Sequence, residues 1–342
     1  MRILMVGHYP PHGGGVARHL DNLVRELRKR HEVHVLTYGP VKVREFEKNL
    51  VHQVNVPPIY GLRGNTFAFK GARKIIELHR KFHFDVLHCH FAGTTSFACA
   101  LAKDRIKVPY VVTAHGSDLE STSKSLFGGI YVRTSLRKAD AVIAVSHHLA
   151  KLARKLGAER VRIIPNGVPK FEIGRERRRY ITFIGALREY KSPETFIELA
   201  RVFPAFQFLV IGEGPLRKKL ESVAPSNVHF MGYREDVDKI LRKSLLLVLP
   251  SKREGFGLVI LEGNSAGVPA VGRRVSAIPE LIREGKNGLT FENFEELVKA
   301  VETLTDPKTN RKMGSIGRRI AGLYSWEDVA RGVEEVYSSL VG

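Results

Sequence analysis

The sequence predicts an α/β protein built from two doubly wound, parallel-sheet domains that face a central cleft. Three observations predict this fold: short apolar runs alternate with amphipathic stretches, the alternation restarts midway along the chain, and a Pro-Asn-Gly turn separates the two series. Buried strands that alternate with helices form parallel sheets covered by helices on both faces. With 342 residues, 43% of them hydrophobic, the chain has enough apolar side chains for two separate cores.

The buried strands form two series. In the first half, apolar runs cover residues 3–6, 33–36, 86–88, 110–113 and 141–145, with helix patterns at 16–30 and 67–82. In the second half they cover residues 180–184, 206–211, 228–230, 245–249 and 268–271. Two prolines flank an Asn-Gly turn signal between residues 164 and 169, and a charged run at 175–179 follows. We therefore expect a first domain at 1–167 and a second at 168–324.

The charge distribution is uneven. The net charge is +20, and residues 1–170 carry 28 Lys and Arg against 12 Asp and Glu, whereas residues 171–342 carry 27 against 23. A basic first half suggests an anionic partner, such as phospholipid headgroups, a phosphorylated acceptor or nucleic acid, although a solvated basic surface is the alternative. The aromatic and basic stretch 67–82 would either rest on an anionic bilayer or pack on its own sheet as an ordinary helix.

Composition also limits location and metal binding. No apolar run reaches the roughly 18 to 20 residues that span a bilayer. Cys89 and Cys99 are the only cysteines, and two cysteines cannot stabilise a chain of this size, so a reduced, cytoplasmic setting is expected, with peripheral contact to the cytoplasmic membrane face as an option. No metal site is expected. Asp236-Val-Asp238 matches a metal-binding Asp-x-Asp formally, but its surroundings are typical of the exposed start of an amphipathic helix.

In doubly wound sheets, ligands bind beyond the carboxyl ends of the strands, where the strand order reverses. After the first strand comes a glycine-rich loop whose Gly14 and Gly15 precede a helix, an arrangement that favours a phosphate. His115 follows the strand at 110–113 and can bond a sugar hydroxyl or an acceptor. Asp118 is expected to cap the next helix.

Two loops of the second domain carry the charged candidates. Arg188 and Lys191 follow the strand at 180–184, where two cations suit a pyrophosphate. Two acids flank a Gly-Phe-Gly turn after the strand at 245–249. Glu262, inside an apolar helix, can accept both hydroxyls of a ribose, and Glu254, on the loop, can bind hexose hydroxyls.

The acid pair within Pro-Ser-x-x-Glu-Gly-Phe-Gly resembles the signature of the retaining glycosyltransferases of family four, which have the GT-B fold of two Rossmann-like domains. Further segments follow the order of that family: 13–15, Asp85-Val-Leu-His-Cys-His90, Thr113-Ala-His-Gly116, Ala139-Asp-Ala-Val-Ile-Ala-Val-Ser146, Pro165-Asn-Gly-Val168, Gly212-Glu-Gly-Pro215 and Ile278-Pro-Glu280. The resemblance covers nearly the whole chain. In folds of this kind the final helix crosses back, so we expect residues 325–342 to pack on the first domain.

The resemblance implies a role for each candidate. Glu262 would bind the donor ribose, while Glu254 and the amides of Phe256, Gly257 and Leu258 would bind the transferred sugar. Lys191 would neutralise the leaving diphosphate with help from the Gly14 and Gly15 amides, and His115 would lie at the reaction centre. The family usually has Arg where this sequence has Ala186, and Arg188 would supply that charge.

The implied activity is metal-independent, retaining transfer of a hexose from a nucleotide sugar, such as a UDP- or GDP-hexose, to a lipid-linked, phosphorylated or glycan acceptor. A nucleotide-sugar epimerase or a sugar phosphorylase on the same fold is the alternative. A nucleic-acid-binding protein, suggested by the sequence pI of 10.0, is more remote, since no interleaved aromatic and basic stripe is present. We therefore expect no nucleic acid partner and no cofactor besides the donor.

Overall fold

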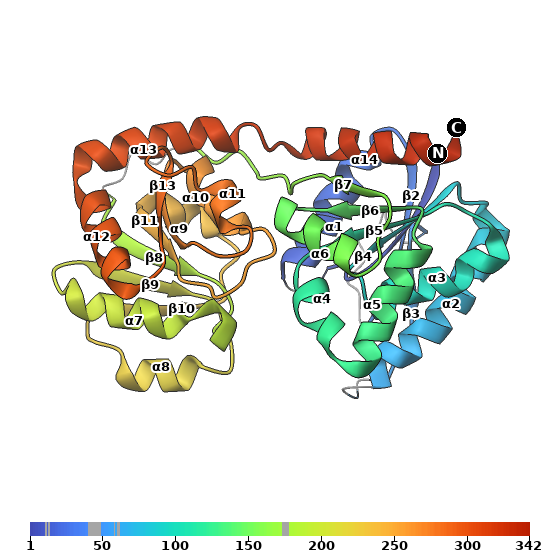
Figure 1. Ribbon diagram of the computed structural model, residues 1–342, viewed down its shortest axis with the longest axis horizontal. Helices are drawn as coiled ribbons and strands as arrows, with labels where there is room; N and C mark the ends of the chain where they lie inside the picture. The colour runs from blue at the N-terminus through green and yellow to red at the C-terminus, as the bar shows by residue number, and fades with distance from the viewer. Residues whose placement is uncertain (11, 13, 40–48, 58, 60–61, 173–177) are drawn as a thin grey trace. The chain divides into compact units, whose positions relative to one another are not determined.

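The computed structural model describes residues 1–10, 12, 14–39, 49–57, 59, 62–172 and 178–342. Gly13 and most of the charged run at 175–179 lie outside the described residues. The chain forms two compact units (Figure 1): residues 1–167 together with 326–342, and residues 168–325. Each unit is an α/β domain with its own parallel sheet.

The first unit is built on a seven-stranded sheet in the order β3-β2-β1-β4-β5-β6-β7, with every pair parallel. Its strands are β1 (Arg2–Val6), β2 (Glu32–Tyr38), β3 (Val51–Val54), β4 (Val86–His90), β5 (Tyr110–Ala114), β6 (Ala141–Ala144) and β7 (Val161–Ile163). The strand order reverses between β1 and β4, which places the switch point of this sheet beside the loops after these two strands.

Helices connect these strands. They are α1 (Gly15–Leu27), α2 (Leu62–Phe82), α3 (Thr94–Ile106), α4 (Ser117–Glu120), the 3-10 helix η2 (Thr122–Lys124), α5 (Leu126–Lys138), α6 (His147–Lys155) and α14 (Trp326–Val341). The last helix belongs to this unit because its apolar face enters the first core: Val329, Val333 and Val336 pack there with Leu20 and Leu23 of α1. The Tyr337 hydroxyl also lies 2.5 Å from Nδ1 of His88 on β4.

The second unit is built on a six-stranded parallel sheet in the order β10-β9-β8-β11-β12-β13. Its strands are β8 (Tyr180–Ile184), β9 (Gln207–Ile211), β10 (Val228–Gly232), β11 (Ser244–Leu249), β12 (Ala270–Arg273) and β13 (Gly288–Phe291). Its helices are η3 (Glu189–Lys191), α7 (Pro193–Val202), α8 (Arg217–Val223), α9 (Val237–Lys243), α10 (Leu258–Ser265), α11 (Ile278–Leu281), α12 (Phe294–Thr305) and α13 (Pro307–Ala321). The switch point lies between β8 and β11.

Three strands were missed from the sequence, namely β3, β7 and β13. All three lie at an edge of the sheets formed by the described strands. Each contains residues that are only partly buried or exposed, and β7 has no buried residue, so none forms the continuous buried apolar run that marks a central parallel strand.

The two cysteines are paired. Cys89 on β4 and Cys99 on α3 are both fully buried and form a disulfide across 10 positions of the chain. The expectation of two reduced thiols was therefore wrong for this structure. The bond joins a strand to the helix that directly follows it, so it links neighbouring elements and leaves the two units unconnected by disulfides among the described residues.

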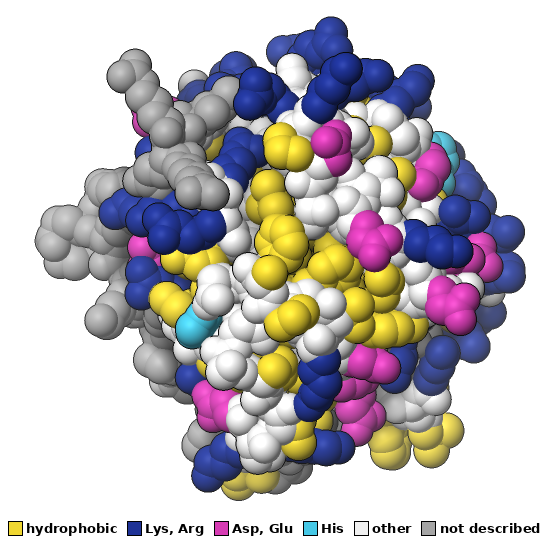
Figure 2. Space-filling model, turned by 90° about the vertical axis from the view of Figure 1, so that its left-hand side faces the viewer, with side chains coloured by type: hydrophobic (Ala, Val, Ile, Leu, Met, Phe, Trp, Pro, Cys, Tyr) yellow, Lys and Arg dark blue, Asp and Glu magenta, His cyan; other side chains and the backbone are white. Residues whose placement is uncertain are grey.

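The surface carries many cations and a few exposed apolar side chains. Figure 2 shows Lys and Arg spread around a central group of hydrophobic side chains on the face it presents. In the first unit the most exposed large hydrophobic residues include Phe69 on α2 and Leu126, Phe127 and Ile130 on α5. Within the described residues no helix combines the length and the apolar composition needed to cross a membrane.

Candidate functional site

The loops after β8 and β11 carry the charged candidates of the second unit. These two strands are neighbours at the switch point, so their carboxyl ends open at the same edge of the sheet. A backbone hydrogen bond from Lys252 N to Tyr190 O, 2.8 Å long, ties the two loops together. A second, from Ala277 N to Glu254 O at 3.2 Å, ties the loop after β11 to the segment before α11. The loops therefore form one connected surface.

Lys191 and Glu254 meet on this surface. The Lys191 ammonium group donates a charge-assisted hydrogen bond to the Glu254 carboxylate. Each of the two side chains is only 15% exposed to solvent. The sequence placed a cation and an acid on two separate loops, and the structure brings them into contact. The pair has an ammonium that can stabilise a phosphate and a carboxylate that can accept sugar hydroxyls, and each group holds the other in place.

Gly257 forms the N-cap of α10. Its φ of 91° lies in the left-handed region, which favours glycine. The bend lets the chain turn from the Glu254 loop into α10. The backbone N–H groups in the first turn of a helix have no helical carbonyl four residues earlier to bind, so they can bind a ligand instead. Phe256 is buried before the turn, and Leu258 begins the helix.

Glu262 lies one turn further along the same helix and is 5% exposed. Helix α10 is buried along most of its length, as its apolar sequence predicts. A carboxylate this deep in a helix needs hydrogen-bonding partners, because an unpaired buried charge is costly. Its position more than one turn inside α10 agrees with the sequence-based placement.

A tyrosine and a further arginine join this surface, and sequence reasoning missed both. The Arg253 guanidinium lies 5.1 Å from the centre of the Tyr190 ring, and Lys191 Nζ lies 5.6 Å from it. Arg188, the candidate substitute for the missing family arginine, is exposed at the start of η3. The signal for Arg253 was its position directly before Glu254, on the loop after a buried strand.

The formal Asp-x-Asp motif has a structural explanation. Asp236 accepts two hydrogen bonds from Arg234, both 2.8 Å long, and Asp238 is paired with Arg242 one turn along α9. Both carboxylates pair with arginines at the start of α9, and this helix start is the one that the sequence predicts. The group of possible metal ligands that the described residues bring together lies elsewhere, in the first unit.

Gly14 and Gly15 lie at the N-terminus of α1, in the first unit. Gly14 is its N-cap with a φ of 105°, so the turn into α1 needs glycine. Both residues are exposed, and among the described residues no atom lies within 4 Å of a Cβ placed on either. The backbone N–H groups at this helix N-terminus favour an anion.

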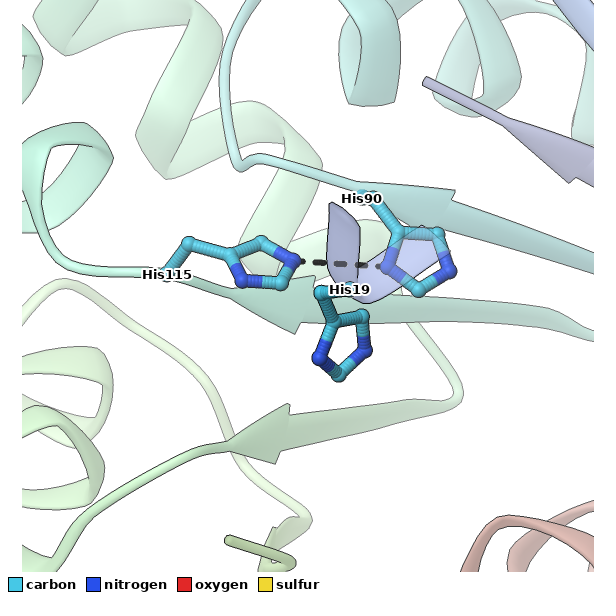
Figure 3. Close-up of side chains that lie close together, drawn as sticks. All are labelled: His19, His90 and His115. Atoms are coloured by element: carbon cyan, nitrogen blue, oxygen red, sulfur yellow. Dashed lines mark hydrogen bonds between the residues drawn. The ribbon is translucent and has the colours of Figure 1, made fainter. Parts of the chain in front are cut away.

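Three histidines converge at the switch point of the first sheet (Figure 3). His19 lies on α1, His90 ends β4 and His115 follows β5. Nδ1 of His90 lies 3.3 Å from Nε2 of His115, and the His19 ring centre is 4.7 Å from that of His115. Burial lowers the pKa of His19 to about 4 and the pKa values of His90 and His115 well below the usual range. All three imidazoles are therefore neutral at pH 7.

Asp118 has a different role from the cap expected of it. Gly116 is the N-cap of α4, and the buried Asp118 carboxylate accepts backbone hydrogen bonds from Ala92, His115, Gly116 and Leu119. Two of these donors lie in the turn that carries His115, and Ala92 lies in the loop after β4. Asp118 thus fixes the backbone of the two loops that present His90 and His115.

Known protein families match both units. Residues 13–170 match the model described as Glycosyltransferase Family 4, and residues 169–320 match Glycosyl transferases group 1. An uncharacterised glycosyltransferase of Methanocaldococcus jannaschii is 31% identical over 99% of both chains. The N-acetyl-alpha-D-glucosaminyl L-malate synthase of Bacillus anthracis is 28% identical over 91% of this chain and 89% of its own.

One further relative and two solved structures are also similar to this chain. The UDP-Gal:alpha-D-GlcNAc-diphosphoundecaprenol alpha-1,3-galactosyltransferase of Escherichia coli is 26% identical over 71% of this chain and 73% of its own. Anabaena HepE, solved in complex with UDP and glucose, superposes with a TM-score of 0.85 at 19% identity over 99% of both chains. Sucrose-phosphate synthase from Thermosynechococcus elongatus gives a TM-score of 0.86 at 19% identity, over 99% of this chain and 98% of that one. The predicted GT-B fold is confirmed.

Proposed function

The chain belongs to the group 1 glycosyltransferases of family 4, and from this premise we propose that it transfers a hexose from a nucleoside-diphosphate sugar to an acceptor. We propose further that transfer retains the anomeric configuration and needs no metal ion. The observation that carries the proposal is the contact between Lys191 and Glu254 at the switch point of the second sheet. We propose that Lys191 binds phosphate and that Glu254, in contact with it, binds the sugar.

The donor groups are assigned to residues of the second unit. Lys191 stabilises the diphosphate, and Arg188 and Arg253 add positive charge on the same pair of loops. Glu254 and the amides of Phe256, Gly257 and Leu258 bind hydroxyls of the hexose, while Glu262 binds the ribose. UDP is a reasonable first donor nucleotide to test, because the similar HepE structure was solved with UDP.

His115, Gly14 and Gly15 are the residues of the first unit assigned to the reaction. A neutral imidazole can donate or accept a hydrogen bond to a sugar hydroxyl without a net charge. The amides at the start of α1 add hydrogen bonds to the phosphate. Both assignments rest on the resemblance and on the position of these residues at the switch point of the first sheet.

The proposed reaction exchanges one bond at the anomeric carbon. The acceptor oxygen bonds to that carbon on the face from which the diphosphate departs, the bond to the phosphate oxygen breaks, and the acceptor proton moves to the leaving phosphate. Negative charge grows on the diphosphate as the bond breaks. Lys191 and the helix N-termini offset that charge, so positioning and electrostatics supply the acceleration.

The proposed acceptor is anionic and is lipid-linked, phosphorylated or a glycan. The excess of basic residues in the first half of the chain supports an anionic partner. One similar enzyme is named for a diphosphoundecaprenol acceptor. We assign peripheral membrane contact to the start of α5, where Leu126, Phe127 and Ile130 are exposed, with Phe69 on α2. The other apolar side chains of the 67–82 stretch pack inside the protein, since Phe67, Ala72, Ile75 and Leu78 are buried.

A donor panel tests this function. Purified protein is incubated with UDP- and GDP-hexoses, with and without candidate acceptors, in excess EDTA, and released nucleotide is measured. We expect one donor to be consumed, acceptor to raise the rate, and the product to keep the anomeric configuration of the donor by NMR. An inverted product would refute retention. Loss of activity in EDTA would refute metal independence, and donor isomerisation without transfer would favour an epimerase.

A further inference from the structure

The histidine cluster of the first unit has the composition of a metal site. His19, His90 and His115 each offer one ring nitrogen, and these three nitrogens all lie within 4.8 Å of one another. The three residues come from a helix, a strand end and the loop after a neighbouring strand, so the fold brings them together over long sequence distances (Figure 3).

The spacing suits a small ion. Two nitrogens that bind one tetrahedral zinc ion at about 2.0–2.1 Å lie about 3.4 Å apart. Nδ1 of His90 and Nε2 of His115 lie 3.3 Å apart. The ring nitrogen that His19 offers lies within 4.8 Å of the other two.

Hydrogen bonds leave a lone pair available on His19. Its Nδ1 lies 2.8 Å from the side-chain oxygen of Asn166, so Nδ1 carries the proton and Nε2 has the free lone pair. That Nε2 is buried and has no hydrogen-bond partner among the described residues. The neighbouring His88 differs, since its two nitrogens contact the hydroxyls of Tyr337 and Thr113.

A buried nitrogen without a partner is costly, and a metal-ligating histidine usually donates its other ring N–H to an oxygen acceptor, as His19 Nδ1 does to Asn166. We propose that His19, His90 and His115 bind one divalent transition-metal ion of the Zn²⁺ type, with a fourth position left for water or an oxygen ligand. The ligands are neutral imidazole nitrogens, which Zn²⁺, Ni²⁺ and Cu²⁺ accept, whereas Mg²⁺ and Ca²⁺ require oxygen ligands. The partly exposed His115 provides the side from which the ion enters.

The ion would act as an inhibitor of the reaction, and this consequence rests on the proposed function. A metal bound to His115 would hold the imidazole that is proposed to bond the sugar, and would so compete with that contact. Micromolar Zn²⁺ is then expected to slow transfer, while millimolar Mg²⁺ leaves it unchanged. Binding itself does not depend on the activity, so the two consequences are tested separately.

The binding test uses the full chain after removal of metals with a chelator. Zn²⁺ is titrated by calorimetry, and Co²⁺ is titrated by its visible absorption as a geometry-sensitive probe. We expect one ion per chain in a tetrahedral or five-coordinate environment. His115→Ala should weaken binding at least 100-fold, and Asn166→Ala about 10- to 100-fold, the range seen when outer partners are removed. Circular dichroism checks that each variant is folded.

His52→Gln is the matched control. His52 stacks on His34 with ring centres 5.2 Å apart, in another part of the same unit, so it offers the most obvious competing imidazole pair. The control should bind Zn²⁺ as wild type does. Equal affinity in wild type and the folded His115→Ala variant would overturn the proposal, and so would a loss of binding in His52→Gln. Zn²⁺ binding without inhibition of an established transfer reaction would overturn only the inhibitory role.

Discussion

Glu254 accepts a charge-assisted hydrogen bond from Lys191, although the two residues lie 63 positions apart in the chain. The contact joins the loop after β8 to the loop after β11 at the point where the second sheet reverses its strand order. With both side chains only 15% exposed, neither charge can be fully solvated if the other is removed. A substitution of either residue therefore changes both the electrostatics and the position of its partner.

Lys191→Ala should reduce kcat at least 100-fold. The variant loses the cation proposed to stabilise the leaving diphosphate, and removal of one oriented charge from such a site typically costs this much. It also leaves the Glu254 carboxylate without its partner, so the free energy of unfolding should fall by about 1–2 kcal/mol. Steady-state transfer assays and urea denaturation measure the two effects.

Lys252→Ala is the control for Lys191→Ala. Lys252 lies on the loop after β11 and is largely exposed, with its ammonium group 3.8 Å from Glu194. Exposed pairs of this kind contribute little to stability, about 0–1 kcal/mol. The control should therefore keep both activity and stability. A Lys191→Ala variant as active as this control would contradict the assignment of Lys191.

Gly257→Ala should impair donor binding and stability together. The φ of 91° is strained for alanine, and the new Cβ would lie 3.1 Å from Cδ1 of Ile260. We expect a loss of about 1–2 kcal/mol of stability and a clear rise in the KM for the donor, because the first turn of α10 would shift. Thermal melts with and without donor nucleotide measure the stability, and steady-state assays at varied donor concentration measure the KM.

Gly285→Ala is the control that distinguishes the effect of backbone strain on stability from an effect on donor binding. Gly285 also has a left-handed φ, 69°, and a Cβ there meets no atom within 4 Å. The control should lose a similar part of its stability and keep the wild-type KM. If both variants showed the same KM, the role proposed for the α10 N-terminus would be wrong.

The central strands of both sheets could be predicted because parallel strands in the middle of a sheet are buried on both faces and appear as continuous apolar runs. The loops that follow them were then identified by the fold rule alone, which placed Lys191, Glu254 and His115 at carboxyl ends of strands. The edge strands β3, β7 and β13 were not predicted because each contains residues that are not fully buried, which interrupt the apolar run.

Local sequence patterns could not predict contacts between residues that lie far apart in the chain. His19 lies inside an amphipathic helix, where a histidine has no special signal, and its partner Asn166 is 147 positions away in a turn. The contact of Arg253 with Tyr190 likewise depends on two loops that only the sheet brings together. Family resemblance supplied the roles of Glu254 and Glu262, whereas the pairing of Glu254 with Lys191 required coordinates.

Replacing Leu126 and Phe127 by Ser should weaken binding to anionic vesicles. These side chains are 78% and 67% exposed at the start of α5, beside the exposed Lys124, and would insert between headgroups. Sedimentation with vesicles containing phosphatidylserine should show wild-type binding that falls with salt, and a loss of about tenfold in the double variant.

Leu323→Ser is the matched control for membrane binding. Leu323 is 68% exposed in the second unit, so the control removes a similar apolar side chain outside the proposed contact surface. It should bind vesicles as wild type does. Equal binding by the control and the α5 double variant, or no wild-type binding at low salt, would remove the membrane assignment.

The histidine content makes the first unit sensitive to acid. His229 is the one histidine of the second unit, and the other 13 of the 14 lie in the first. Burial lowers the pKa of His52 to about 4, with a further contribution from His34, and burial likewise lowers the pKa of His8 to about 4. Both side chains ionise near pH 6.5 in the unfolded chain. Between pH 4 and pH 6.5 the unfolded state binds more protons than the folded state. The contribution of these two histidines to the free energy of unfolding is therefore fully present above about pH 6.5 and is lost as the pH falls towards 4.

His52→Gln tests this pH dependence, because glutamine keeps a polar amide in place of the imidazole and does not titrate. The Tm of the wild type should fall on going from pH 7 to pH 5, and the fall should be smaller in the variant by about 2–4 °C. Calorimetry at the two pH values measures the difference. His229→Gln, which removes an exposed histidine of the second unit, should leave the wild-type fall unchanged. If the His52 and His229 variants lost stability in acid to the same extent as wild type, the neutral state of His52 would not contribute to folding.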